Sequence, residues 1–299
     1  MSQQQRDTVN QIYRDAPFDL GGAVNEQRPL LEKMLTGRPL PADVRTTAGE
    51  LGGVPAIFID IADVTARGTL FHLHGGGFAL GSAAGSVGLA SSLARKAGMR
   101  AVSIDYRLAP EHPYPTALRD VTAAYRALID QGGSAGRVVV SGESAGGNLA
   151  VELLIAGKAD ALSMPAAAVL FSPITDLTVS GASFTSKSGV DPSITEAAIR
   201  TRVGDYLGAT GTEPADPLVS PVFADLTGLP PLLIQAGSHE VLLDDATALA
   251  TRAAADDVAV TLDITPRVPH VFQAFSAVLD EGDAALTRAA TFIQDRLSW

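Results

Sequence analysis

The stretch Val138-Val139-Val140-Ser141-Gly142-Glu143-Ser144-Ala145-Gly146-Gly147-Asn148 decides the fold. Three valines, typical of a buried strand, lead into the pattern G-x-S-x-G, and residues compatible with a helix follow. A serine on a sharp turn between strand and helix needs neighbours without Cβ atoms, and Gly142 and Gly146 meet that need. The stretch therefore predicts that Ser144 is a nucleophile. It also predicts that the amide of Ala145, at the positive end of the helix, points to where an oxyanion forms.

Short apolar runs alternate with amphipathic stretches from Thr69 onward, which predicts βαβ units around a mostly parallel sheet. The expected parallel strands are 69–73, 100–104, 138–141, 167–171, 232–236 and 261–264. Two further runs, 44–47 and 54–61, predict an antiparallel entry to the same sheet. Apolar residues at i, i+3, i+4 and i+7 predict helices around 121–129, 246–253 and 286–297.

Two segments break this alternation: residues 1 to about 43, and about 176–217. Both have the composition of helices, and apolar residues recur at helical spacing between 194 and 203. Open α/β sheets bind their ligands at the carboxyl edge, and an insertion in this position would lie over that edge. We therefore predict that the two segments form a cap within a single domain spanning 1–299. Packing of these helices elsewhere on the domain is the alternative.

A second glycine-rich motif, Leu73-His74-Gly75-Gly76-Gly77-Phe78, directly follows the expected strand 69–73. Three successive glycines leave backbone amides unshielded, so such a loop can present donors to a developing alkoxide. We assign that role to Gly76 and Gly77, together with Ala145. A phosphate-binding loop is the alternative, but G-x-G-x-x-G is not matched in register and no G-K-[ST] follows. Nucleotide binding is therefore not expected.

A serine nucleophile needs a base, and the chain offers five histidines: His72, His74, His112, His239 and His270. The first lies inside an expected strand, the second opens the glycine loop, and the third stands between a glutamate and a proline. His270 follows the last expected strand, where the chain order Ser, Asp/Glu, His of the α/β-hydrolase fold places the base. We therefore assign His270 as the base.

The third member of a triad is expected after the strand 232–236, where Glu240, Asp244 and Asp245 occur. Glu240 lies in the connecting loop, whereas the two aspartates stand where a helix begins and where the helix dipole favours acids. We assign Glu240 as the acid that holds the imidazole tautomer and stabilises the imidazolium. Asp244 is the alternative.

Composition narrows the classes of partner and location. The 299 residues carry a net charge of −11, which repels phosphate backbones and anionic lipid surfaces, so neither nucleic acid nor membrane is expected as a partner. Cysteine is absent, which removes disulfides, thiolate metal sites and cysteine nucleophiles. No run of about 18 apolar residues occurs and the first residues are polar, so we expect no membrane span, no export and a cytoplasmic location.

Two other function classes stay open from the residues alone. His72 and His74, at i and i+2 of one strand, could point the same way and bind a divalent ion, as in a metal-dependent hydrolase. A non-catalytic small-molecule receptor could use the same fold, but it would normally lack part of a triad. Because every triad role has a candidate here and the histidine pair has no further histidine partner, we expect no metal and no organic cofactor.

The motifs at 74–77, 105–113 and 142–147 resemble those of the bacterial hormone-sensitive-lipase-like (family IV) esterases of the α/β-hydrolase superfamily. The likeness covers nearly the whole chain. It implies an α/β-hydrolase fold with a mostly parallel eight-stranded sheet flanked by helices, and a helical cap. It also implies a nucleophile, acid and base at Ser144, Glu240 and His270, and a carboxylesterase that acts on short- to medium-chain acyl esters.

The chain departs from the pattern of most such esterases at two positions, where Glu143 and Glu240 stand in place of aspartate. The longer acid at 240 must reach its histidine differently, and we expect Glu143 to be structural, bonding behind the serine turn. The stretch 268–275 is similar to lactone hydrolases, which adds lactones as a substrate class. A homodimer, formed through the last strand or the closing helix, is a further expectation.

Overall fold

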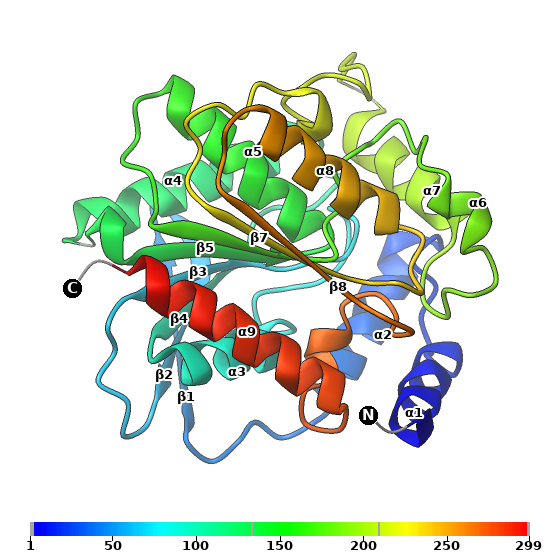
Figure 1. Ribbon diagram of the computed structural model, residues 1–299, viewed down its shortest axis with the longest axis horizontal. Helices are drawn as coiled ribbons and strands as arrows, with labels where there is room; N and C mark the ends of the chain where they lie inside the picture. Colours follow the sequence, from blue (N-terminus) through cyan, green and yellow to red (C-terminus); the bar gives the residue numbers. More distant parts are fainter. Residues whose placement is uncertain (1–2, 133, 209, 298–299) are drawn as a thin grey trace.

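An eight-stranded sheet forms the centre of the computed structural model, which describes residues 3–132, 134–208 and 210–297 (Figure 1). The strand order is β1-β2-β4-β3-β5-β6-β7-β8, and the pairs from β4 to β8 are all parallel. The strands are β1 (Val44–Leu51), β2 (Val54–Ile61), β3 (Thr69–Leu73), β4 (Arg100–Ile104), β5 (Val138–Glu143), β6 (Ala167–Phe171), β7 (Leu232–Gly237) and β8 (Val260–Thr265). The predicted mostly parallel sheet is confirmed.

The antiparallel entry to the sheet is also confirmed, but β1 is longer than expected. It pairs with β2 along its whole length, and β2 pairs antiparallel with β4. The expected run ended at Thr47, and the residues that follow, Ala48-Gly49-Glu50, have weak strand propensity. A two-residue turn at Gly52 and Gly53, with φ of 59° and 80°, closes a tight hairpin that keeps these residues in register.

Helices cover both faces of the sheet (Figure 1). They are α1 (Gln3–Arg14), α2 (Val24–Thr36), α3 (Val87–Ala97), α4 (Thr116–Asp130), α5 (Ala145–Ala159), α6 (Ser183–Ser186), α7 (Glu196–Leu207), α8 (Leu243–Ala255) and α9 (Asp280–Arg296). One face packs against α3 and α9, and the other against α4, α5 and α8. Among the described residues, no helix is both long and apolar enough to cross a lipid bilayer.

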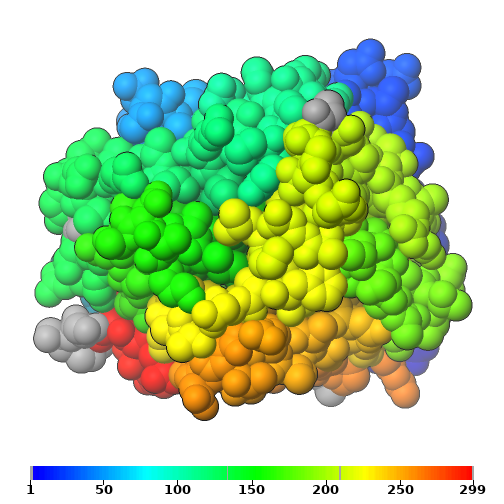
Figure 2. Space-filling model, turned by 90° about the horizontal axis from the view of Figure 1, so that it is seen from above, coloured from blue at the N-terminus to red at the C-terminus, as the bar shows by residue number. Residues whose placement is uncertain are grey.

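The two segments that break the alternation lie at the end of the sheet toward which β7 and β8 point, where α1, α2, α6 and α7 gather (Figure 1). The segment 176–217 is helical only at α6 and α7, because glycine, serine and proline between them favour turns. Its buried residues Phe184, Ile199 and Tyr206 belong to the same core as α4 and α5. Figure 2 shows the chain returning from this segment (yellow) across the molecule toward the orange region of α8.

The amino-terminal helix packs on the loop that follows β8. Val9, the one buried residue of α1 in the described chain, joins a small apolar cluster with Val268 and Phe272. Tyr13 packs against the same cluster, with its ring edge-on to Phe275 at 5.2 Å between centroids. The start of the chain therefore contacts residues on both sides of His270, which are far away in the sequence.

Candidate active site

The predicted turn between strand and helix is present at Ser144. β5 ends at Glu143 and α5 begins at Ala145, and Ser144 itself has φ 55° and ψ −118°, an unfavourable backbone conformation for a residue with a side chain. A Cβ on Gly142 would collide with the carbonyl of Gly146, and one on Gly146 would collide with that of Leu73. The glycines are therefore required by close backbone approach, as the sequence predicted.

The glycine loop after β3 leaves backbone donors free beside the serine. Gly76 and Gly77 have φ of 113° and 62°, which side chains rarely adopt, and a Cβ on Gly77 would meet Arg202 Cγ at 2.5 Å. Among the described residues, the amides of Gly76, Gly77 and Ala145 donate to no protein acceptor. Unused donors on a fixed loop and at a helix N-terminus are what an oxyanion requires.

Glu143 ties the serine turn to the glycine loop. Its Oε1 accepts hydrogen bonds from Gly75 N at 2.9 Å and from Ser86 Oγ at 2.8 Å. Its Oε2 lies 2.8 Å from His72 Nε2, and His72 Nδ1 lies 2.8 Å from Ser141 Oγ. Burial by itself raises the pKa of the Glu143 carboxyl, but its interactions with His72 and the other donors outweigh burial and lower it. The expected bonding of Glu143 behind the serine turn is confirmed.

His74 fixes the start of the same loop. Its ring stacks on Tyr106 at 4.1 Å between centroids, its Nδ1 lies 2.8 Å from Gly75 O, and the Tyr106 hydroxyl donates to His74 O at 2.6 Å. Burial lowers the pKa of His74. Both histidines that could have formed a metal pair thus contact protein groups. The described residues contain no cluster of three or more side chains suited to holding a metal ion.

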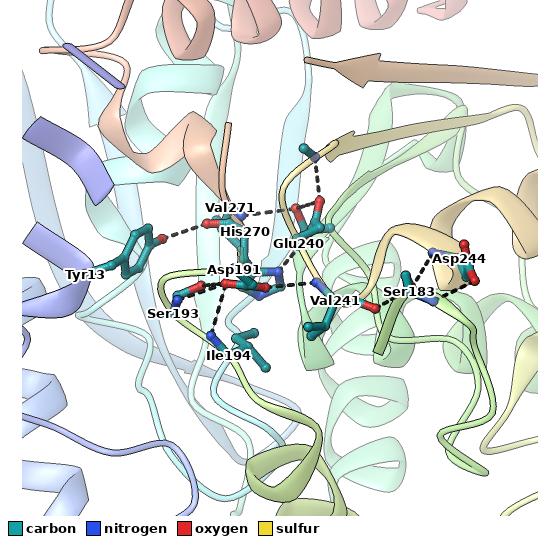
Figure 3. A network of polar contacts seen from close by, with 12 residues as sticks. Tyr13, Ser183, Asp191, Ser193, Ile194, Glu240, Val241, Asp244, His270 and Val271 are labelled. Atoms are coloured by element: carbon teal, nitrogen blue, oxygen red, sulfur yellow. Dashed lines mark hydrogen bonds and ion pairs between the residues drawn. The ribbon is translucent and has the colours of Figure 1, made fainter. Parts of the chain in front are cut away.

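The structure brings the predicted base and acid into contact (Figure 3). His270 Nδ1 lies 2.7 Å from Glu240 Oε2, and the two residues are only 7% and 0% exposed. The other oxygen of Glu240 accepts a short hydrogen bond from Gly237 N. Asp244 faces away, accepting a hydrogen bond from Ser183 N at 2.9 Å. Glu240 therefore contacts the imidazole of His270 from its loop, whereas the alternative acid, Asp244, contacts the 176–217 segment.

Ser172 links the two halves of the site, and sequence reasoning gave it no role. Its hydroxyl donates to Glu240 Oε1 at 3.1 Å and accepts from Val271 N at 3.1 Å. The preceding carbonyl, Phe171 O, accepts from Ser144 N at 2.9 Å. The available signal was a Ser-Pro pair directly after a buried strand, too common to identify a position.

The nucleophile and the base are not joined by a direct bond in this structure. The described residues show no hydrogen bond between the Ser144 hydroxyl and the ring of His270, whose Nδ1 is occupied by Glu240. Ser144 is 8% exposed, so both groups lie beneath the surface. Catalytic hydrogen bonds are often long without substrate and tighten in the complex.

A further buried carboxyl, Asp245, lies where the 176–217 segment leaves the sheet. Its Oδ1 accepts hydrogen bonds from Thr175 N at 2.7 Å and Asp176 N at 3.0 Å. Burial raises the pKa of Asp245 to about 7, although the two amides oppose the shift. The folded protein therefore keeps this proton at pH values at which the unfolded chain has lost it.

We expect the contribution of Asp245 to the unfolding free energy to fall as pH rises from about 4 to about 7, by at most about 1.4 kcal/mol per pH unit. Asp245→Asn should remove that contribution, because an amide does not titrate. Urea denaturation at several pH values measures the slope, with Asp7→Asn on the exposed side of α1 as the control for loss of one charge. Equal slopes in Asp245→Asn and the parent protein would contradict the assignment.

Comparison with known proteins shows the family to which the fold belongs. The family model described as the alpha/beta hydrolase fold matches residues 70–274. An acetyl-hydrolase of Streptomyces hygroscopicus is 42% identical over 255 residues, which cover 82% of this chain and 85% of that protein. An esterase of Acinetobacter venetianus is 37% identical over 276 residues, covering 92% and 90%.

Similarity to solved structures extends over the full chain. The crystal structure of an esterase from the bacterial hormone-sensitive lipase family has a TM-score of 0.95 and 38% sequence identity, and the match covers 100% of both chains. The match therefore includes the helices at the carboxyl end of the sheet as well as the sheet itself. The chain belongs to the α/β-hydrolase superfamily and, within it, to the bacterial hormone-sensitive-lipase-like esterases.

Proposed function

We propose that this chain is a carboxylic ester hydrolase that acts on short- to medium-chain acyl esters through an acyl intermediate on Ser144. The observation that carries the proposal is the buried His270–Glu240 pair, 2.7 Å apart, tied by Ser172 to the strand end that bonds Ser144. The relatives named above as an acetyl-hydrolase and an esterase support the same reaction class.

In the proposed mechanism, His270 Nε2 takes the proton of the Ser144 hydroxyl while Ser144 Oγ attacks the ester carbonyl. Glu240 accepts the Nδ1–H bond, which fixes the tautomer and stabilises the imidazolium that forms. The imidazolium then protonates the leaving alcohol. Water, activated by the same imidazole, releases the carboxylic acid and restores the serine.

The tetrahedral intermediate carries an oxyanion, which the free amides of Gly76, Gly77 and Ala145 would hold. Two of these donors come from a loop with positive φ and the third from the first residue of α5. The bond from Gly75 N to Glu143 holds the loop against the serine turn, so the donors need little reorganisation during the reaction.

We further propose that residues 1–43 and 176–217 form a cap that sets the size of the substrate. Their helices lie at the carboxyl end of the sheet (Figure 1). Ser144 and His270 are only 8% and 7% exposed. Such limited access favours small acyl groups and compact lactones over long chains.

A panel of p-nitrophenyl acetate, butyrate, octanoate and hexadecanoate, together with a γ-lactone, tests this proposal. We expect kcat/KM to be highest for acetate or butyrate and to fall by at least about tenfold at hexadecanoate, because the longest chain cannot be buried. A serine-directed phosphonate should abolish all turnover. Fastest hydrolysis of long-chain triglyceride emulsions, or turnover that survives the phosphonate, would contradict the proposal.

A further inference from the structure

Polar side chains from both segments of the proposed cap bond to the backbone at or beside a catalytic residue (Figure 3). Asp191, in the turn between α6 and α7, accepts a hydrogen bond through Oδ2 from Val241 N at 2.9 Å, one residue after Glu240. Tyr13, on α1, donates its hydroxyl to His270 O at 2.7 Å. The acid and the base are therefore each held from the cap side.

The two oxygens of Asp191 have separate partners. Oδ1 accepts from Ser193 N at 2.8 Å, Ser193 Oγ at 2.7 Å and Ile194 N at 3.1 Å, which closes the turn before α7. Only Oδ2 bonds the acid loop, the segment 238–242 between β7 and α8 that carries Glu240. Ser183 Oγ donates to Val241 O, so the backbone N–H and C=O of Val241 are both bonded to this one segment. Asp191 is 8% exposed, and a buried carboxylate with four donors is fixed in place.

The side chain of Tyr13 is also held in a fixed position, by apolar packing. Its ring packs edge-on against Phe275, and Val9 one turn earlier packs in the cluster that includes Val268. Burial raises the pKa of the Tyr13 hydroxyl, so it stays a donor to the His270 carbonyl at every working pH. The contact joins residues 257 positions apart and connects the amino-terminal segment to the base.

We infer that Asp191 and Tyr13 are positioning residues: docking of the cap sets the orientation of the His270–Glu240 pair toward Ser144. This inference rests on the proposed function. Both side chains bond to backbone atoms and neither bonds the catalytic side chains, so they act through the loops. Loss of either contact should lower kcat with little change in KM, because a misplaced base weakens the transition state and not substrate binding.

The test compares Asp191→Asn with a matched control, Asp176→Asn. In Asp191→Asn, the amide group either faces Val241 N–H with a second donor or gives up the turn, and both outcomes break the link to the acid loop. Asp176 is a carboxylate of the same segment, also 8% exposed, whose side chain bonds Thr178 and Ser180 in its own turn. Both variants lose one negative charge.

We expect kcat for p-nitrophenyl butyrate to fall by about tenfold in Asp191→Asn, less than the 10²-fold that a displacement of about 1 Å can cost. Tyr13→Phe removes one hydrogen bond but keeps the ring that packs against Phe275, so it should lower kcat by about threefold. KM should stay within about twofold in both variants, and Asp176→Asn should match the parent protein. Rates are expressed per titrated active site, which removes any contribution from misfolded protein.

A second readout needs no ester substrate. The rate constant for phosphonylation of Ser144 depends on the same base, so it should fall in parallel with kcat in Asp191→Asn and Tyr13→Phe. Parent rates in those two variants, or an equal loss in Asp176→Asn, would overturn the inference. If the parent protein is phosphonylated at Ser144 but hydrolyses no ester, the proposed function fails, and phosphonylation rates alone decide whether the two residues position the base.

Discussion

Replacing Ser144 by alanine should lower kcat for p-nitrophenyl butyrate by about 10⁴- to 10⁶-fold, the range seen when a triad enzyme loses its nucleophile. No other group at the turn can form the acyl intermediate, because Gly142, Glu143, Ala145 and Gly146 surround the serine and the Glu143 carboxylate is held by three donors. A small residual rate should persist, since the free amides of the glycine loop still stabilise an oxyanion formed by direct attack of water.

The Ser144→Ala variant should fold as well as the parent. The described residues show no hydrogen bond made by the Ser144 hydroxyl, so alanine leaves no buried partner unsatisfied. Denaturation curves check this point, and Ser92→Ala on α3, whose hydroxyl bonds its own helix at Gly88 O, controls for loss of a serine hydroxyl. A Ser144→Ala enzyme that keeps more than about a tenth of the parent rate would place the nucleophile elsewhere.

Most of the sheet could be predicted because strands buried on both faces are apolar along their whole length. β2, β3, β4 and β6 begin and end where expected. β1 could not be predicted to its end, because pairing with β2 and a glycine turn, not strand propensity, keep Ala48 to Glu50 extended. The 176–217 segment was expected to be more helical than it is, since the spacing of a few apolar residues says nothing about the turns between them.

The residues of the candidate site were likewise predicted only in part. Ser144 and the glycine loop could be assigned because their motifs are local: the backbone strain and the glycines that permit it lie within a few residues. Ser172, Asp191 and Tyr13 could not, because each acts through contacts between residues far apart in the sequence. The homodimer and the cytoplasmic location stay predictions. An apolar residue on the outermost strand β8, Leu262, is 40% exposed, at the edge through which a dimer was expected to form.

The sequence favoured Glu240 over Asp244, because Asp244 stands where a helix begins, but it left Asp244 open as an alternative since both residues follow β7 closely. The structure places Glu240 on His270 and Asp244 on Ser183. The side chain of a glutamate is one methylene longer than that of an aspartate, so its loop must accommodate the extra length. The bonds from Gly237 N and Ser172 Oγ to Glu240 Oε1 leave Oε2 directed at the imidazole, so the extra length is held in a single orientation.

Glu240→Gln should therefore lower kcat by about 10⁴-fold, the size of the effect when a triad carboxylate becomes an amide. The glutamine is nearly the same shape, but the NH2 group of its amide faces either the two donors Gly237 N–H and Ser172 Oγ–H or the imidazole. In the second case the imidazole must turn Nδ1 into an acceptor, which leaves the proton on Nε2 and no base for Ser144. Measurement of kcat per phosphonate-titrated site separates this effect from misfolding.

Asp244→Asn is the matched comparison, because it makes the same chemical change four residues later. We expect its kcat to stay within about threefold of the parent value, since it loses at most one partly exposed hydrogen bond to Ser183. Glu240→Asp should fall between the two, by about 10²-fold, because a shorter acid can keep the charge near His270 but not the 2.7 Å contact. The reverse order, with Asp244→Asn the more damaging change, would assign the acid to Asp244 and require the loop after β7 to rearrange during the reaction.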